Sequence, residues 1–116
     1  MYLIQNITDY PLQSQVQTLP DGTLVTFQLY FVPMQFGWFI TNLTYGSFIL
    51  NSLRVVNSPN MLLQFQNQIP FGIACYSAGN REPSQQQDFS SGASQLYLLD
   101  QTDVKEFYNF LQTGSI

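Results

Sequence analysis

Alternating hydrophobic and polar residues dominate the first third of the chain. Residues 12–18 and 24–32 form two alternating runs, separated by a segment, residues 19–23, that contains Pro20 and Gly22. Proline presets φ for a turn and glycine tolerates positive φ, so this segment predicts the turn of a β-hairpin. In the second arm the alternation predicts a set of residues that face the core: Val25, Phe27, Leu29 and Phe31.

A second hairpin is predicted after the first. Residues 38–44 and 48–56 resemble strands, and they meet at residues 45–47, where a glycine again marks the turn. The first arm does not alternate cleanly, because its apolar residues fall on both faces: Trp38 and Ile40 on one, Phe39 and Leu43 on the other. Strands of this kind are usually covered on both sides. The cover comes either from the rest of the domain or from a neighbouring subunit.

The second half of the chain combines late strands with a long polar loop. Pro59 is placed to start a short helical turn, and residues 73–77 and 95–99 are predicted strands. Between these strands, the polar loop at 77–93 is too long for a simple connection, and loops of this length tend to be functional or disordered. Two alternatives fit the segment: a solvated flexible loop, or a contact arm that a partner orders.

The hydrophobic period changes near the C-terminus. Val104, Phe107 and Leu111 recur at helical spacing, and Asp100 is a suitable N-cap, so residues 100–111 are predicted to form a short amphipathic helix. A helix of this length is marginal in isolation. Its apolar face must therefore dock either on the sheet of its own domain or on a neighbouring chain.

Together these elements predict a single mainly β domain over residues 1–116, an antiparallel β-sandwich or partly closed barrel with a short C-terminal α-helix. Composition adds a functional hint, since the chain is 16% aromatic and only 9% charged, and it contains no histidine. Its polar residues are mostly neutral amides and hydroxyls. Surfaces buried against other subunits are depleted in charge and enriched in aromatic residues, so the composition favours a chain that works inside an assembly.

Charge and hydropathy exclude several partners. The formal net charge is −4, and the basic residues are Arg54, Arg81 and Lys105, widely separated along the chain. Nucleic-acid binding needs clustered cations, so we expect no direct nucleic-acid ligand. No apolar run approaches the roughly 20 residues that span a bilayer, and the start of the chain lacks the basic region of a signal peptide. We expect synthesis in a cytoplasm and no membrane insertion.

Side chains that carry chemistry are sparse. The single cysteine, Cys75, lies in an apolar stretch and is expected to be a buried, inert thiol. Hydrolysis by paired carboxylates is the common catalytic scheme that needs no histidine, but the acidic residues are better explained by a turn, a helix start and a soft loop. Neither metal-ligand spacing nor a glycine-rich phosphate loop occurs. We therefore expect no enzymatic activity, no cofactor and no metal.

Several short motifs follow one another in a definite order: Asp21-Gly22-Thr23, Gly37-Trp38-Phe39-Ile40, Met61-Leu62-Leu63, Phe71-Gly72-Ile73-Ala74, Asp88-Phe89-Ser90-Ser91-Gly92 and Leu96-Tyr97-Leu98-Leu99. This order resembles that of the small plug proteins of contractile-tailed phage baseplates. The resemblance implies a β-rich structural protein of the virion, made in the bacterial host cytoplasm. Several copies would form a ring against the hub, the tail tube end and other baseplate proteins, and would hold the tail tip together before contraction. The glutamine-rich segment 85–87 departs from the family pattern.

A structural role of this kind depends on contact surfaces. We predict contacts with neighbouring subunits at aromatic residues, in the polar loop and in the C-terminal helix: Trp38, Phe39, Asn80, Arg81, Gln85, Gln86, Gln87, Phe89, Phe107 and Tyr108. The main alternative is a soluble ligand-binding or carbohydrate-binding β module, whose stacking residues would be Trp38, Tyr30, Tyr45, Tyr76 and Tyr97. A hydrolase of unfamiliar type is the third hypothesis.

Overall fold

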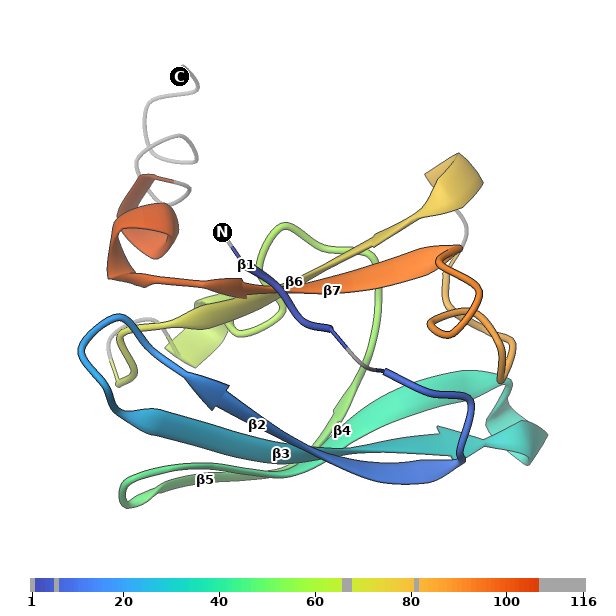
Figure 1. Ribbon diagram of the computed structural model, residues 1–116, viewed down its shortest axis with the longest axis horizontal. Helices are drawn as coiled ribbons and strands as arrows, with labels where there is room; N and C mark the ends of the chain where they lie inside the picture. Colours follow the sequence, from blue (N-terminus) through green and yellow to red (C-terminus); the bar gives the residue numbers. More distant parts are fainter. Residues whose placement is uncertain (1, 6, 66–67, 81, 107–116) are drawn as a thin grey trace.

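The structure is a computed structural model that describes residues 2–5, 7–65, 68–80 and 82–106. Two antiparallel sheets lie one above the other, with strand orders β2-β3-β4-β5 and β1-β7-β6 (Figure 1). The strands are β1 (Tyr2–Leu3), β2 (Leu12–Thr18), β3 (Leu24–Val32), β4 (Gly37–Tyr45), β5 (Phe48–Arg54), β6 (Gly72–Ser77) and β7 (Ser94–Leu99). The predicted mainly β fold is confirmed, and over the described residues the sheets form a sandwich rather than a closed barrel.

The first predicted hairpin forms with the predicted turn. Gly22 has φ 90°, and its N–H donates to the Leu19 carbonyl at 2.8 Å. The Asp21 carboxylate accepts a hydrogen bond from the Thr23 N–H at 2.9 Å, and this bond lowers the pKa of Asp21. The turn fixes the register of β2 with β3, so that Thr18 lies opposite Leu24.

β4 contains a bulge that decides which of its side chains are buried. Between residues 41 and 44 this strand has one more residue than its partner β3. Asn42 takes the extra place with φ 52°, a left-handed conformation that asparagine tolerates better than most residues. The bulge brings Leu43 to the same inner face as Trp38, and both side chains are fully buried. Of the apolar residues in this arm, Phe39 remains on the outer face, where it is half-buried.

The core lies between the two sheets. The face of β3 predicted to be buried is buried, and the largest fully buried side chains are Trp38, Phe27 and Phe71. The outer edge of β6 is covered, because Ser58 and Cys75 exchange two backbone hydrogen bonds of 2.9 and 3.0 Å. The segment around Pro59 continues along β6, since the Met61 N–H donates to the Ile73 carbonyl at 2.7 Å. The short helical turn that we predicted after Pro59 therefore begins later, as the 3-10 turn η2 (Leu63–Phe65).

The C-terminal helix begins as predicted. Residues 101–106 are helical, and the Asp100 carboxylate accepts a hydrogen bond from the Asp103 N–H at 2.9 Å. The Asp103 carboxylate accepts one from the Asp100 N–H at 3.2 Å, which completes a reciprocal capping arrangement. Val104 packs against Ala74 and Leu99, so this part of the helix docks on its own sheet. Residues 107–111 of the predicted helix lie outside the described residues.

Candidate protein-interaction surface

The outer face of the four-stranded sheet is the most distinctive surface of the molecule. The register of the strands places the following residues together on this side, which we call the outer sheet face: Leu12, Ser14, Val16 and Thr18 of β2; Leu24, Thr26, Gln28 and Tyr30 of β3; Phe39, Thr41 and Thr44 of β4; Ile49, Ser52 and Arg54 of β5. Arg54 at one corner is the single charged residue in these four strands. The face therefore combines aliphatic, aromatic, hydroxyl and amide groups with almost no charge.

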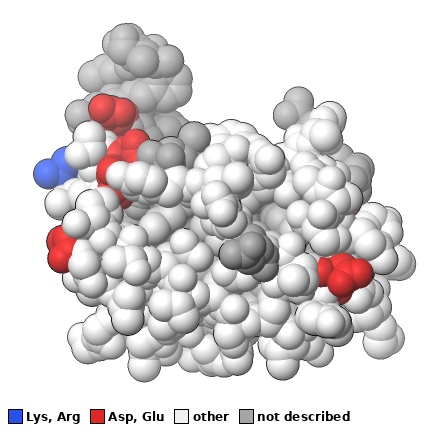
Figure 2. Space-filling view, in the orientation of Figure 1, with Lys and Arg blue, Asp and Glu red and all other residues white. Residues whose placement is uncertain are grey.

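Large apolar side chains stand exposed on the outer sheet face. Val16 is 59% exposed and Ile49 is 63% exposed, and both lie in one row across the strands with Thr26 and Thr44. In Figure 2, which shows the sandwich from the side, the charged atoms lie along the left end and at one place on the right, while the lower part of the view, along the four-stranded sheet, is white. Contact surfaces between subunits have this composition, apolar and depleted in charge.

β2 presents its apolar side chains outward and its glutamines inward. Because Gln15 lies opposite the core residue Phe27, the odd-numbered residues of β2 face the other sheet. Gln13 is held there by side-chain hydrogen bonds with the backbone of Thr8 and Tyr10, at 2.9 to 3.1 Å. β2 is an edge strand, so the amides reach the polar rim of the sandwich rather than its dry centre.

One end of the sheet continues into an apolar tip, the turn formed by η1 (Pro33–Gln35) and Phe36. Met34 is 92% exposed and Phe36 is 66% exposed. The Arg54 guanidinium holds this turn in place, since its Nη2 donates to the carbonyls of Gln35 and Phe36 at 3.2 and 3.4 Å. The same guanidinium lies 5.5 Å from the centre of the Phe39 ring, a cation–π contact.

Glycine at position 37 makes this arrangement of the tip possible. A Cβ atom at Gly37 would lie 2.7 Å from Nη2 of Arg54, so a larger residue would displace the guanidinium. Phe36 has φ 48°, which costs energy for a bulky residue. The tip is therefore a held, strained turn that exposes two large apolar side chains.

The polar loop predicted at 77–93 is folded onto its own domain over residues 82–93. The Asp88 carboxylate is buried and accepts hydrogen bonds from the N–H groups of Ser84 and Gln85 at 2.8 and 2.9 Å. The Asp88 carbonyl accepts a third from the Ser94 N–H at 2.9 Å. Pro83 is fully buried. Residues 82–93 are therefore neither a solvated flexible loop nor a contact arm that a partner orders, because contacts within the domain itself hold them in place.

Trp38 connects this loop to the core. Its indole Nε1 donates to the Gln85 carbonyl at 3.0 Å, and its ring packs edge to face against Phe89 with centroids 5.5 Å apart. On the other side it packs against Phe31 at 5.3 Å. The indole is fully buried, so it holds the loop from the core side and offers no exposed surface to a partner.

The predicted contact residues fall into four groups. The prediction that Trp38 and Phe89 lie on a contact surface is wrong. Both are core residues, because β4 and the loop at 82–93 direct these side chains inward. Gln85 and Gln87 are exposed, whereas Gln86 is half-buried and its amide donates to the Asp9 carbonyl at 2.7 Å. Four predictions lie outside the described residues: the side chain of Asn80, and Arg81, Phe107 and Tyr108. Phe39 is the member of the set on the outer sheet face.

Sequence reasoning missed most of the exposed apolar side chains on this face and tip: Leu12, Val16, Met34, Phe36 and Ile49. It named Tyr30 only for the alternative ligand module. A usable signal was present for β2 and β3. Once Val25, Phe27, Leu29 and Phe31 are assigned to the core, hairpin pairing places the even-numbered residues of both strands on the opposite face. The low charge of that face also follows directly from the sequence, since Arg54 is the single charged residue in the four strands.

The aromatic residues of the alternative ligand platform are not gathered at one place. Trp38 is buried, Tyr45 packs against Phe71 of the core at 5.3 Å, and Tyr30 lies on the outer sheet face. Tyr76 and Tyr97 pack together at 5.8 Å on the three-stranded sheet. A ligand that stacks on all five rings at once has no site here.

Cys75 is buried as predicted. Burial raises the pKa of its thiol from 9.0 to about 11, and the nearby Glu82 charge adds to this rise, while a hydrogen bond with Ser77 opposes it. Among the described residues, no group of three or more His, Cys, Asp and Glu side chains is placed to hold a metal ion. Within the same residues, no helix has the length and apolar character needed to cross a bilayer.

Comparison of the sequence with protein-family models finds no match, and comparison with curated proteins finds none.

Proposed function

We propose that the protein is a structural subunit of a contractile-tailed phage baseplate, and that its outer sheet face packs against the central hub or the end of the tail tube. The observation that carries this proposal is the chemistry of that face: four strands with exposed Val16, Ile49 and Tyr30 side chains and one charged residue, Arg54. Exposed apolar patches of this kind on a stable β domain typically mark interaction sites.

The order of sequence motifs supports the choice of a baseplate among possible assemblies, since it resembles that of the small plug proteins of contractile tails. In this proposal several copies form a ring in the virion, after synthesis in the bacterial host cytoplasm. Their role is mechanical: they join hub to tube and help hold the tail tip together before contraction. Neutral amide and hydroxyl groups on the face supply hydrogen bonds without the desolvation cost of buried charges.

The loop at 82–93 contributes a second, smaller contact. Its anchors at Asp88 and Trp38 fix the backbone, so the exposed side chains of Gln85 and Gln87 are presented without a large entropic cost of ordering. We expect these glutamines to add hydrogen bonds at the rim of the interface, while the outer sheet face supplies its centre.

Tail assembly with a charged outer sheet face tests the proposal. Val16→Lys places an ammonium group at the centre of β2, on a side chain that is 59% exposed in the isolated chain. We expect the variant to fold normally and to reduce the number of assembled tails at least tenfold. Leu3→Lys is the matched control, since Leu3 is an exposed strand residue, 44% exposed, on the other sheet. Normal tails from folded Val16→Lys protein would refute the proposed role of this face.

A further inference from the structure

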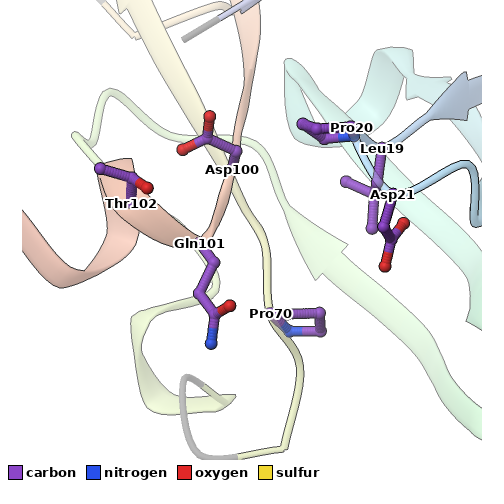
Figure 3. Close-up of a pocket in the computed structure, with 7 residues that line it drawn as sticks. All are labelled: Leu19, Pro20, Asp21, Pro70, Asp100, Gln101 and Thr102. Atoms are coloured by element: carbon purple, nitrogen blue, oxygen red, sulfur yellow. The ribbon is translucent and has the colours of Figure 1, made fainter.

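The molecule has a pocket at the opposite end of its long axis from the apolar tip. It is a cavity of about 200 Å³ between the β2–β3 turn, Pro70 and the start of the C-terminal helix. Its lining residues are Leu19, Pro20, Asp21, Pro70, Asp100, Gln101 and Thr102. Figure 3 shows that these residues come from three separate segments around the pocket: the β2–β3 turn, Pro70 and the start of the C-terminal helix. In Figure 1 the pocket segments lie at the left end, and the tip, coloured near residue 35 on the bar, lies at the right end.

The pocket and the tip are complementary in chemistry. The pocket offers apolar walls from Leu19, Pro20 and Pro70, and its lining includes two acidic residues, Asp21 and Asp100. Their carboxylates accept hydrogen bonds from the N–H groups of Thr23 and Asp103 and keep their negative charge. The tip offers two exposed apolar side chains, Met34 and Phe36, beside the guanidinium of Arg54. An apolar knob next to a cation thus matches an apolar pocket next to two anions.

From this complementarity we infer that copies of this chain associate head to tail, with the tip of one copy seated in the pocket of the next. The inference rests on the proposed function, which calls for several copies, and adds the contact that joins them. A tip and a pocket at opposite ends of one molecule form a heterologous interface, and such interfaces build rings when the rotation between copies closes.

Electrostatics favours this arrangement over a symmetric dimer through the pocket end. Two pocket ends brought together would oppose Asp21 and Asp100 of one copy to the same carboxylates of the other, without a pocket cation between them. Like charges placed face to face disfavour that pairing, while the approach of Arg54 to the pocket selects the head-to-tail orientation. Because Asp21 is an exposed residue, the charges mainly select the orientation, and burial of Met34 and Phe36 supplies most of the affinity.

Cross-linking of the isolated full-length chain tests the contact. One preparation carries Gln35→Cys, at an exposed position of the tip that leaves Met34 and Phe36 in place, and a second, isotopically labelled preparation carries Gln101→Cys at the pocket. A short bis-maleimide joins the two at high protein concentration, and mass spectrometry counts the mixed dimers. Ile49→Cys is the matched control for the second preparation, since Ile49 is also exposed but lies on the outer sheet face. The buried Cys75 is retained in all chains, and chains without an added cysteine measure its background.

We expect at least tenfold more mixed dimer with Gln101→Cys than with Ile49→Cys. Arg54→Glu in the Gln35→Cys chain should reduce the yield about tenfold, and Asp21→Lys in the Gln101→Cys chain should restore it. Should Arg54→Glu disturb folding, Phe36→Asn serves in its place, because asparagine accepts the positive φ of this position and removes the apolar ring. Equal yields with Gln101→Cys and Ile49→Cys would overturn the head-to-tail contact. That result would leave the baseplate role standing, since tail assembly with Val16→Lys tests that role separately.

Discussion

Gly72 and Asn60 lie in close contact beside the edge strand β6. The Asn60 side chain is buried, and its Oδ1 accepts a hydrogen bond from the Leu62 N–H at 3.0 Å. Within the described structure its Nδ2 is buried without a hydrogen-bond partner. A Cβ atom at Gly72 would overlap this amide, at 2.7 Å from Cγ. Glycine is therefore required here by space, not by backbone conformation.

Gly72→Ala should lower the free energy of unfolding by about 1–3 kcal/mol, the usual cost of overpacking a well-packed site. Urea denaturation measures the loss. In an Asn60→Ala background the space is open, and the same substitution should cost less than about 1 kcal/mol, so the two changes form a double-mutant cycle with a clear coupling. Equal costs in both backgrounds would show that the amide does not limit the space at Gly72.

Cys75 should be unreactive in the folded protein. Its thiol is buried, and burial raises its pKa to about 11, so almost no thiolate forms near pH 8. A thiol reagent such as dithionitrobenzoate should modify the folded chain at least a hundredfold more slowly than the chain in urea. Similar rates in both states would contradict the burial of this side chain.

The raised pKa of Cys75 also predicts a pH dependence of stability. The folded thiol keeps its proton up to about pH 11, whereas the unfolded thiol loses it near pH 9. Stability is therefore unaffected by this group below pH 9 and falls by about 2–3 kcal/mol between pH 9 and 11. Cys75→Ala should remove this part of the loss, and urea denaturation at both pH values measures it.

At the scale of elements, the loop at 82–93 depends on one carboxylate. Asp88→Ala removes the acceptor of the Ser84 and Gln85 N–H groups and should cost about 1–3 kcal/mol. Because Trp38 is the single tryptophan and donates to the Gln85 carbonyl, its fluorescence reports directly whether the loop is docked. We expect a red shift and faster proteolysis within the loop. Gln87→Ala, at an exposed site in the same loop, should change neither.

The elements themselves were largely predictable from the sequence. Alternation identified the first hairpin and the buried face of β3, and the turn at Gly22 has the expected conformation. The bulge at Asn42 was not predictable from periodicity, because one extra residue reverses the facing of every later side chain in the strand. The docking of the loop was missed for a similar reason, since Asp88 and Trp38 are distant in sequence and meet through the fold.

At the scale of the whole molecule, the candidate surface was harder to predict than the fold. The sequence indicated contact residues by type, and aromatic residues such as Trp38 and Phe89 proved to be core residues. The outer sheet face depends on which residues share a side across four strands. Val16 and Ile49 come to lie in one row, with Thr26 and Thr44 between them, only after β2, β3, β4 and β5 are paired. Low charge was visible in the sequence as a general property, and strand pairing shows that the outer sheet face carries one charged residue, Arg54.

The proposed role of the whole molecule requires a fixed number of copies in each particle. Quantitative mass spectrometry of purified phage particles from the source system measures this number against the known tail proteins. The proposed function predicts a few copies of the chain per particle, in a constant ratio to the hub. Absence of the chain from intact particles would contradict it.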